Sequence, residues 1–165
     1  MKIILGIDPG ANTGLAVVAF PKGKAQLLDR RTIRTKPREP LPERLATVFR
    51  GVVLFIQTYR PDIVAVEGMR TWMVRAGGVK STVIQAQFHG AVLAAVMHAR
   101  PPGCQVQIIP PPRTRWSGRG RTRTVGLATK EYARRVCETY FGKSDLSEHE
   151  ADAAVLALAA RKEQK

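Results

Sequence analysis

The chain has 165 residues, of which 44% are hydrophobic, and this size and content suit one domain over residues 1–165 with an ordinary core. A formal net charge of +14 favours nucleic acid or an anionic membrane as partner, but the sequence has neither a basic amphipathic helix nor a lipidation signal, which disfavours the membrane. It also lacks a run of 18 apolar residues and a secretory signal pattern, so we expect a cytoplasmic protein.

Three strands are predicted first, at about residues 2–8, 13–20 and 25–34, because apolar runs there are separated by proline and glycine turn signals. They form a meander. The first strand delivers Asp8 to a Pro-Gly turn. An aspartate at this position is commonly a turn cap, so its residue type alone does not make it functional.

A helix is predicted after Pro40, where apolar residues recur at helical spacing, and it should end before Pro61. A buried strand at 62–67 follows and delivers Glu67. Glutamate is a poor turn former, and its burial without compensation is costly. Glu67 therefore implies a metal ion or a basic partner.

The rest of the chain continues as a helix at about 79–99, a short strand at 105–109, and helices at about 126–140 and 147–162. This order predicts an α/β protein with the ribonuclease H-like fold, a five-stranded mixed sheet flanked by helices. If the first strand is central, the crossover to the fourth strand places Asp8 and Glu67 side by side.

The last helix begins with a capping-box pattern, Ser147-x-x-Glu150, which assigns Glu150 a structural role worth about 1 kcal/mol. His149 and Asp152, three residues apart, share one helix face, and Glu148 is a weaker substitute. The alanines that follow would let this helix lie close against the sheet.

Four residues therefore form the candidate catalytic and metal-binding set: Asp8, Glu67, His149 and Asp152. Hard oxygen ligands suit Mg²⁺ or Mn²⁺, and two such ions can support phosphodiester hydrolysis. His149 would either bind a metal ion or handle a proton, and the sequence leaves both roles open. Cys104 and Cys137 lack the spacing of a zinc site and are expected to be reduced thiols.

Much of the positive charge lies in two segments, residues 30–38 and 113–123. Because these segments also contain proline or glycine, we predict that they are loops that follow phosphates. The expected DNA-contacting arginines in the second segment are Arg113, Arg115, Arg119, Arg121 and Arg123.

The sequence resembles the RuvC family of Holliday-junction resolvases over nearly its whole length. The resemblance is carried by Gly6-Ile7-Asp8-Pro9-Gly10 with Thr13-Gly14, Val66-Glu67-Gly68, Gln87-Phe88-His89-Gly90, a basic loop before Lys130, and His149-Glu150-Ala151-Asp152-Ala153-Ala154. It implies a homodimeric endonuclease that makes paired nicks in four-way DNA junctions with Mg²⁺ or Mn²⁺. Two active sites related by a twofold axis are what symmetric resolution requires.

The resemblance also implies roles for single residues. Asp8, Glu67, His149 and Asp152 correspond to the catalytic set, although many members carry aspartate where His149 stands. Lys130 matches a lysine associated with DNA and catalysis, and an ordinary solvated helix lysine is the other interpretation. Members often place a base-stacking aromatic where Arg70 stands. Trp72 would either replace it or pack in the core.

Three other functions fit part of the pattern. One is another ribonuclease H-like nuclease, such as a YqgF-like enzyme acting on RNA or branched DNA, although Asp8-Pro9-Gly10 favours the resolvase. A second is an actin-like ATPase, whose fold normally needs two such halves. The third is a DNA-binding module without catalysis, which charge alone does not exclude.

Overall fold

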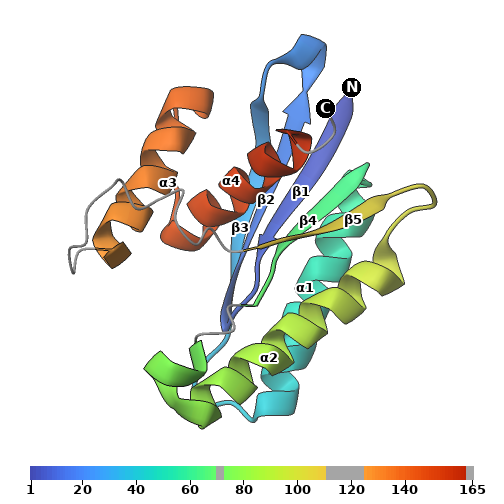
Figure 1. The fold of residues 1–165 in the computed structure, drawn as a ribbon. Helices are drawn as coiled ribbons and strands as arrows, with labels where there is room; N and C mark the ends of the chain where they lie inside the picture. The colour runs from blue at the N-terminus through green and yellow to red at the C-terminus, as the bar shows by residue number, and fades with distance from the viewer. Residues whose placement is uncertain (70–72, 111–124, 163–165) are drawn as a thin grey trace.

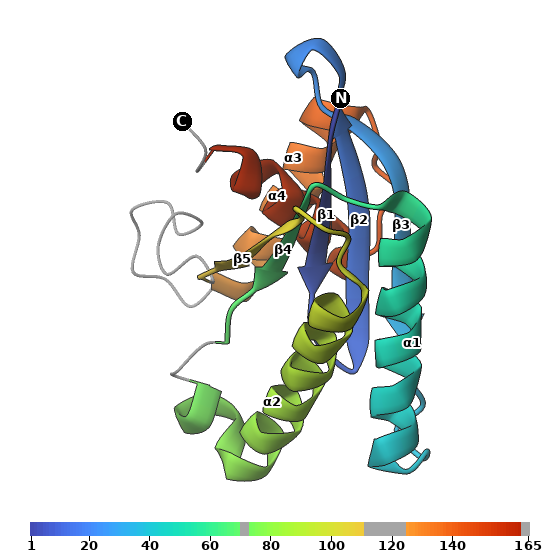
Figure 2. The same cartoon turned by 90° about the vertical axis from the view of Figure 1, so that its right-hand side faces the viewer.

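The structure is a computed structural model that describes residues 1–69, 73–110 and 125–162. For residues 73–77, 125–130 and 162 it describes the backbone only. Five strands form one sheet in the order β3-β2-β1-β4-β5. Helices α1 and α2 cover one face of the sheet, and α3 and α4 cover the other (Figures 1 and 2). This is the predicted five-stranded mixed sheet flanked by helices.

The first three strands form the predicted antiparallel meander. They are β1 (Lys2–Asp8), β2 (Asn12–Phe20) and β3 (Gln26–Arg34), and a short 3-10 turn, η1 (Pro21–Gly23), joins the last two. Lys22 and Gly23 both have positive φ angles, of 48° and 86°, which makes this a tight connection. The meander leaves β1 inside the sheet, where its other edge pairs in parallel with β4 (Ile63–Glu67).

The prediction of a loop over residues 30–38 is wrong for its first half, because residues 30–34 belong to β3. This strand lies at the edge of the sheet, where charged side chains can face water without breaking the hydrogen-bond ladder. Arg30 also binds another side chain of the protein, since its guanidinium makes two hydrogen bonds to Asp145, of 2.9 and 2.5 Å. The positive charge of this segment therefore did not indicate a loop in residues 30–34.

Two helices pack on one face of the sheet. Helix α1 (Leu41–Tyr59) ends as predicted before Pro61, with Arg60 in the left-handed conformation. Helix α2 (Met73–Ala99) is interrupted at Gly78, whose φ and ψ of 72° and 163° are not helical. The predicted helix at 79–99 is the part that follows this interruption. Parallel strand β5 (Gln105–Ile109) comes next.

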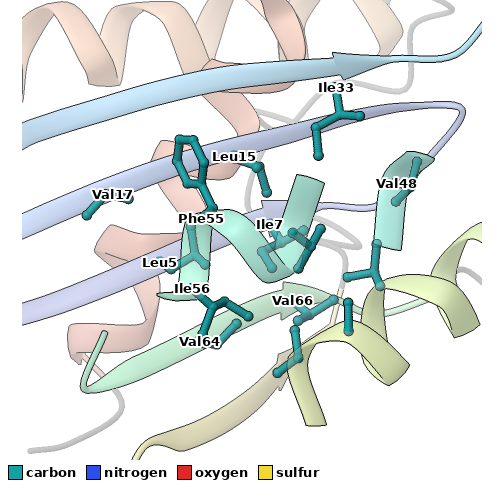
Figure 3. Packing of buried hydrophobic residues seen from close by; sticks show 14 of the residues in the cluster. Leu5, Ile7, Leu15, Val17, Ile33, Val48, Phe55, Ile56, Val64 and Val66 are labelled. Atoms are coloured by element: carbon teal, nitrogen blue, oxygen red, sulfur yellow. The ribbon is translucent and has the colours of Figure 1, made fainter. Parts of the chain in front are cut away.

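The main core lies between the sheet and these two helices (Figure 3). It includes Leu5 and Ile7 of β1, Val64 and Val66 of β4, and the fully buried Phe88 of α2. Leu5, Ile7, Val64 and Val66 occupy alternate positions, because successive side chains of a strand point to opposite faces.

The opposite face is covered by α3 (Val125–Phe141) and α4 (Glu148–Lys162). Ile4 of β1 and Ile63 and Ala65 of β4 pack there against Leu156 and Ala157 of α4. Burial on both faces explains why β1 and β4 are almost continuously apolar. In the described part of the chain, no helix is both long and apolar enough to cross a membrane.

Candidate active site

Asp8 and Glu67 are the last residues of two neighbouring parallel strands, β1 and β4. The register of this pair ends at Ile7 opposite Val66, so the two acids are the next residues on adjacent strands. The alternation of side chains along a strand also determines which face of the sheet Asp8 and Glu67 share. Ile63 and Ala65 pack toward α4, and Glu67 therefore belongs to the α4 face, as does Asp8, two residues beyond Gly6.

Two glycines let α4 lie directly on this part of the sheet. A Cβ atom on Gly6 would lie 1.8 Å from the carbonyl oxygen of Ala153, and one on Gly14 would lie 2.0 Å from that of His149. No side chain fits at such distances. These glycines thus let the backbone of the first turns of α4 lie against β1 and β2. The alanines of α4 predicted this close packing.

This close approach places His149 in contact with Asp8. The Nδ1 atom of His149 lies 2.9 Å from Oδ2 of Asp8, and the histidine comes from a segment 141 residues further along the chain. The hydrogen bond is the largest cause that raises the pKa of His149 above its usual value. The charges of Asp8, Glu148 and Asp152 act in the same direction, while partial burial opposes them.

Glu150 has the structural role predicted for it. Its Oε2 accepts a hydrogen bond from the backbone N–H of Ser147 at 3.0 Å, and the Ser147 hydroxyl accepts one from the N–H of Glu150 at 3.3 Å. Thr32 of β3 contacts both side chains, since its hydroxyl lies 2.8 Å from Ser147 Oγ and donates to Glu150 Oε1 at 3.1 Å. The capping box therefore also ties the start of α4 to the sheet.

Asp152 lies one turn beyond His149 and is partly buried. It contributes to the electrostatic environment of Cys137, whose pKa is raised to about 11, first by burial and then by the Asp152 charge. Cys137 and Cys104 are both free and buried, as expected for reduced thiols.

The structure brings Asp8 and His149 into direct contact and places Glu67 and Asp152 on the elements beside them. Over residues 1–69, 73–110 and 125–162, no three acidic, histidine or cysteine side chains form a ready-made metal-holding group. The chemistry of the four donors nevertheless fits Mg²⁺ or Mn²⁺, because three of them are carboxylates and the fourth is an imidazole. Their role as a metal-binding set stays a prediction.

The predicted DNA-contacting residues are mostly outside the described ranges. These are Arg70 and Trp72 after β4, and Arg113, Arg115, Arg119, Arg121 and Arg123 before α3. Lys130 lies in α3, within a stretch whose side chains the structure does not define. Their contacts with DNA therefore also stay predictions.

Two contacts at the acidic strand ends were not predicted. Nε2 of Gln85 donates a hydrogen bond to the carbonyl oxygen of Pro9 at 3.0 Å, and Nε2 of His89 lies 3.0 Å from the carbonyl oxygen of Glu67. Both side chains come from α2, on the other face of the sheet. Gln85 and His89 are four residues apart, about one helical turn, so the sequence could have indicated that they share one face of the helix.

The comparisons with known proteins agree with this arrangement. The family model described as crossover junction endodeoxyribonuclease RuvC matches residues 4–105. A crossover junction endodeoxyribonuclease RuvC from Saccharophagus degradans is 36% identical over 104 residues, which are 62% of this chain and 58% of that protein. The chain thus aligns with less than two thirds of the length of this curated relative.

Solved structures match over nearly the whole chain. The structure of Thermus thermophilus RuvC has a TM-score of 0.73 and 30% identity, covering 98% of this chain and 97% of that one. The T. thermophilus RuvC structure in complex with a Holliday junction substrate has a TM-score of 0.74 and 28% identity, covering 98% and 96%. These likenesses establish the ribonuclease H-like fold predicted from the order of the elements. Because the family model also covers more than half of the sequence, the chain belongs to the RuvC family.

Proposed function

We propose that this chain is a metal-dependent endonuclease that resolves four-way DNA junctions in recombination and repair. The observation that carries the proposal is the meeting of Asp8 with His149, beside Glu67 on the next strand, in a chain of the RuvC family. The relatives that match it are named as junction endonucleases, and one solved structure holds a Holliday junction.

Asp8, Glu67, His149 and Asp152 would hold Mg²⁺ or Mn²⁺, and we extend the proposal to two ions. When bound, the cations would supply Lewis-acid stabilisation of the charge that develops on the scissile phosphate. The carboxylates that would hold the ions come from two strand ends and from the first turns of α4.

The contact between His149 and Asp8 defines what this histidine can do. An ionised Asp8 can only accept a hydrogen bond, so Nδ1 of His149 carries the proton in this contact. In the neutral ring, Nε2 then has the lone pair. That nitrogen can bind a cation or accept a proton, and Asp8 orients it for either role.

The proposed partners follow from the substrate. Two copies of the chain are needed to place two nicks symmetrically, so we propose a homodimer. The net charge of +14 supplies attraction to the junction arms, and binding should weaken steeply with added salt. A DNA substrate also favours a cytoplasmic location.

The test compares a synthetic four-way junction with a linear duplex of the same sequence, each incubated with Mg²⁺ or Mn²⁺. We expect paired nicks in two junction strands of like polarity and little cutting of the duplex. Equal cutting of both DNAs would indicate an unselective nuclease. Binding without cutting under either ion would indicate a DNA-binding module, and preferential cutting of RNA would indicate a different nuclease of the same fold.

A further inference from the structure

We propose that Gln85 and His89 of α2 are positioning residues that set the relative placement of the strand ends bearing Asp8 and Glu67. This inference rests on the proposed function, because it concerns the geometry of the same metal-binding acids. Neither residue belongs to the candidate catalytic set, and both act from the opposite face of the sheet.

The two contacts have the same form. Gln85 donates to the carbonyl oxygen of Pro9, which directly follows Asp8, and His89 contacts the carbonyl oxygen of Glu67 itself, both at 3.0 Å. A carbonyl oxygen can only accept, so His89 must carry its proton on Nε2. One turn of a single helix thus contacts the main chain of Glu67 and of the residue that follows Asp8.

Both strand ends continue past the last pair of their ladder. The ladder between β1 and β4 ends at Ile7 and Val66, one residue before the two acids. Beyond it, the β4 end is tied to β5 instead, through the N–H of Gly68 and the carbonyl of Ile109 at 2.8 Å. Helix α2 therefore adds a connection between the two strand ends beyond the last pair of the ladder, and we expect it to influence the spacing of Asp8 and Glu67.

Helix α2 is firmly anchored between the two contacts. Phe88 is fully buried in the core, and the guanidinium of Arg44 lies 5.2 Å from its ring centroid. Arg44 also donates to the Thr35 hydroxyl at 3.1 Å, and Thr35 donates to the carbonyl of Ala11 at 2.8 Å. The turn after Asp8 and the helix that holds it thus belong to one connected network.

The side chains of Asp8 and Glu67 face α4, while α2 holds their main chains from behind. A metal site tolerates displacements of only about 0.5 Å in its ligands. Loss of residues that orient ligands typically lowers metal affinity or activity by about 10–100-fold. We therefore expect this pair to affect metal binding and turnover without affecting DNA affinity.

The experiment replaces each donor with a side chain of similar shape, in Gln85→Leu and His89→Phe. The matched controls are Gln57→Leu, at an exposed position on α1, and His98→Phe, at an exposed position further along α2 where the ring contacts Phe49. His89→Gln is the rescue variant, because its amide can still donate to the Glu67 carbonyl.

Two quantities are measured on each full-length variant after circular dichroism has verified folding. Electron paramagnetic resonance of Mn²⁺ in the absence of DNA gives metal affinity, and nicking of a four-way junction gives kcat and KM. We expect Gln85→Leu and His89→Phe to bind Mn²⁺ roughly 10–100-fold more weakly and to lose kcat with KM unchanged. The controls should match the wild type, and His89→Gln should recover most of the loss.

Wild-type Mn²⁺ affinity and kcat in both Gln85→Leu and His89→Phe would overturn the positioning role while leaving the proposed function intact. A folded His89→Gln variant as impaired as His89→Phe would overturn the hydrogen-bond argument for His89. If the wild-type protein itself neither binds Mn²⁺ nor cuts the junction, the proposed function fails, and the positioning role fails with it.

Discussion

Replacing Gly14 with alanine tests how closely α4 must lie against the sheet. The new Cβ atom would lie 2.0 Å from the carbonyl oxygen of His149, where ordinary contacts begin at 3.4 Å, so the start of α4 must recede by about 1.4 Å. Overpacking of this kind costs about 1–3 kcal/mol of unfolding free energy. A displacement of about 1 Å in a catalytic group can lower the rate on the order of 100-fold.

We expect Gly14→Ala to lower the free energy of unfolding by about 1–3 kcal/mol, measured by urea denaturation, and to lower junction nicking roughly 100-fold. Gly90→Ala is the control for stability, because nothing lies within 4 Å of its added Cβ. Within a helix this change should be neutral or stabilise by about 0.5–1 kcal/mol. Wild-type stability and nicking in Gly14→Ala would refute the close approach of α4.

Three other predictions concern the surroundings of the site. Ser147→Ala removes the N-cap of α4 and should lower the free energy of unfolding by about 1 kcal/mol in urea denaturation, whereas an unchanged value would contradict the capping role. The hydrogen bonds from Arg30 lower the pKa of Asp145 from 3.8 to about 2. The stabilisation from this pair is therefore present above pH 3.8 and is lost as the pH falls toward 2. The difference in urea midpoint between the wild type and Asp145→Asn should shrink over that range, and a constant difference would argue against the pair. Because its pKa is raised to about 11, Cys137 should react very slowly with a disulfide reagent at pH 8 in the folded protein and quickly after unfolding. Equal rates in the two states would show that the thiol is accessible.

The order of the elements could be predicted because the apolar runs, prolines and glycines mark their boundaries. The strand at 63–67 and the helix at 41–59 end close to their predicted limits, since Pro61 prevents the helix from continuing. The helical break at Gly78 could not be predicted in this way, because a single glycine within a helical pattern is often tolerated.

The site was only partly predictable. Strand order and side-chain alternation are enough to bring Asp8 and Glu67 to one edge and one face. The direct bond between Asp8 and His149 depends on how near α4 lies, which Gly6 and Gly14 permit but which no residue pattern measures. The contact of His89 with a strand-end carbonyl was missed for a different reason, since a polar residue on a helix usually faces water.

We propose that Asp8 belongs to a catalytic centre that cuts DNA junctions. The most direct test of this proposal is nicking of a synthetic four-way junction by wild type and Asp8→Asn with Mn²⁺, with junction binding measured by gel shift. We predict that the amide variant loses nicking while it binds the junction as the wild type does. Retained nicking in folded Asp8→Asn would contradict a catalytic role for Asp8.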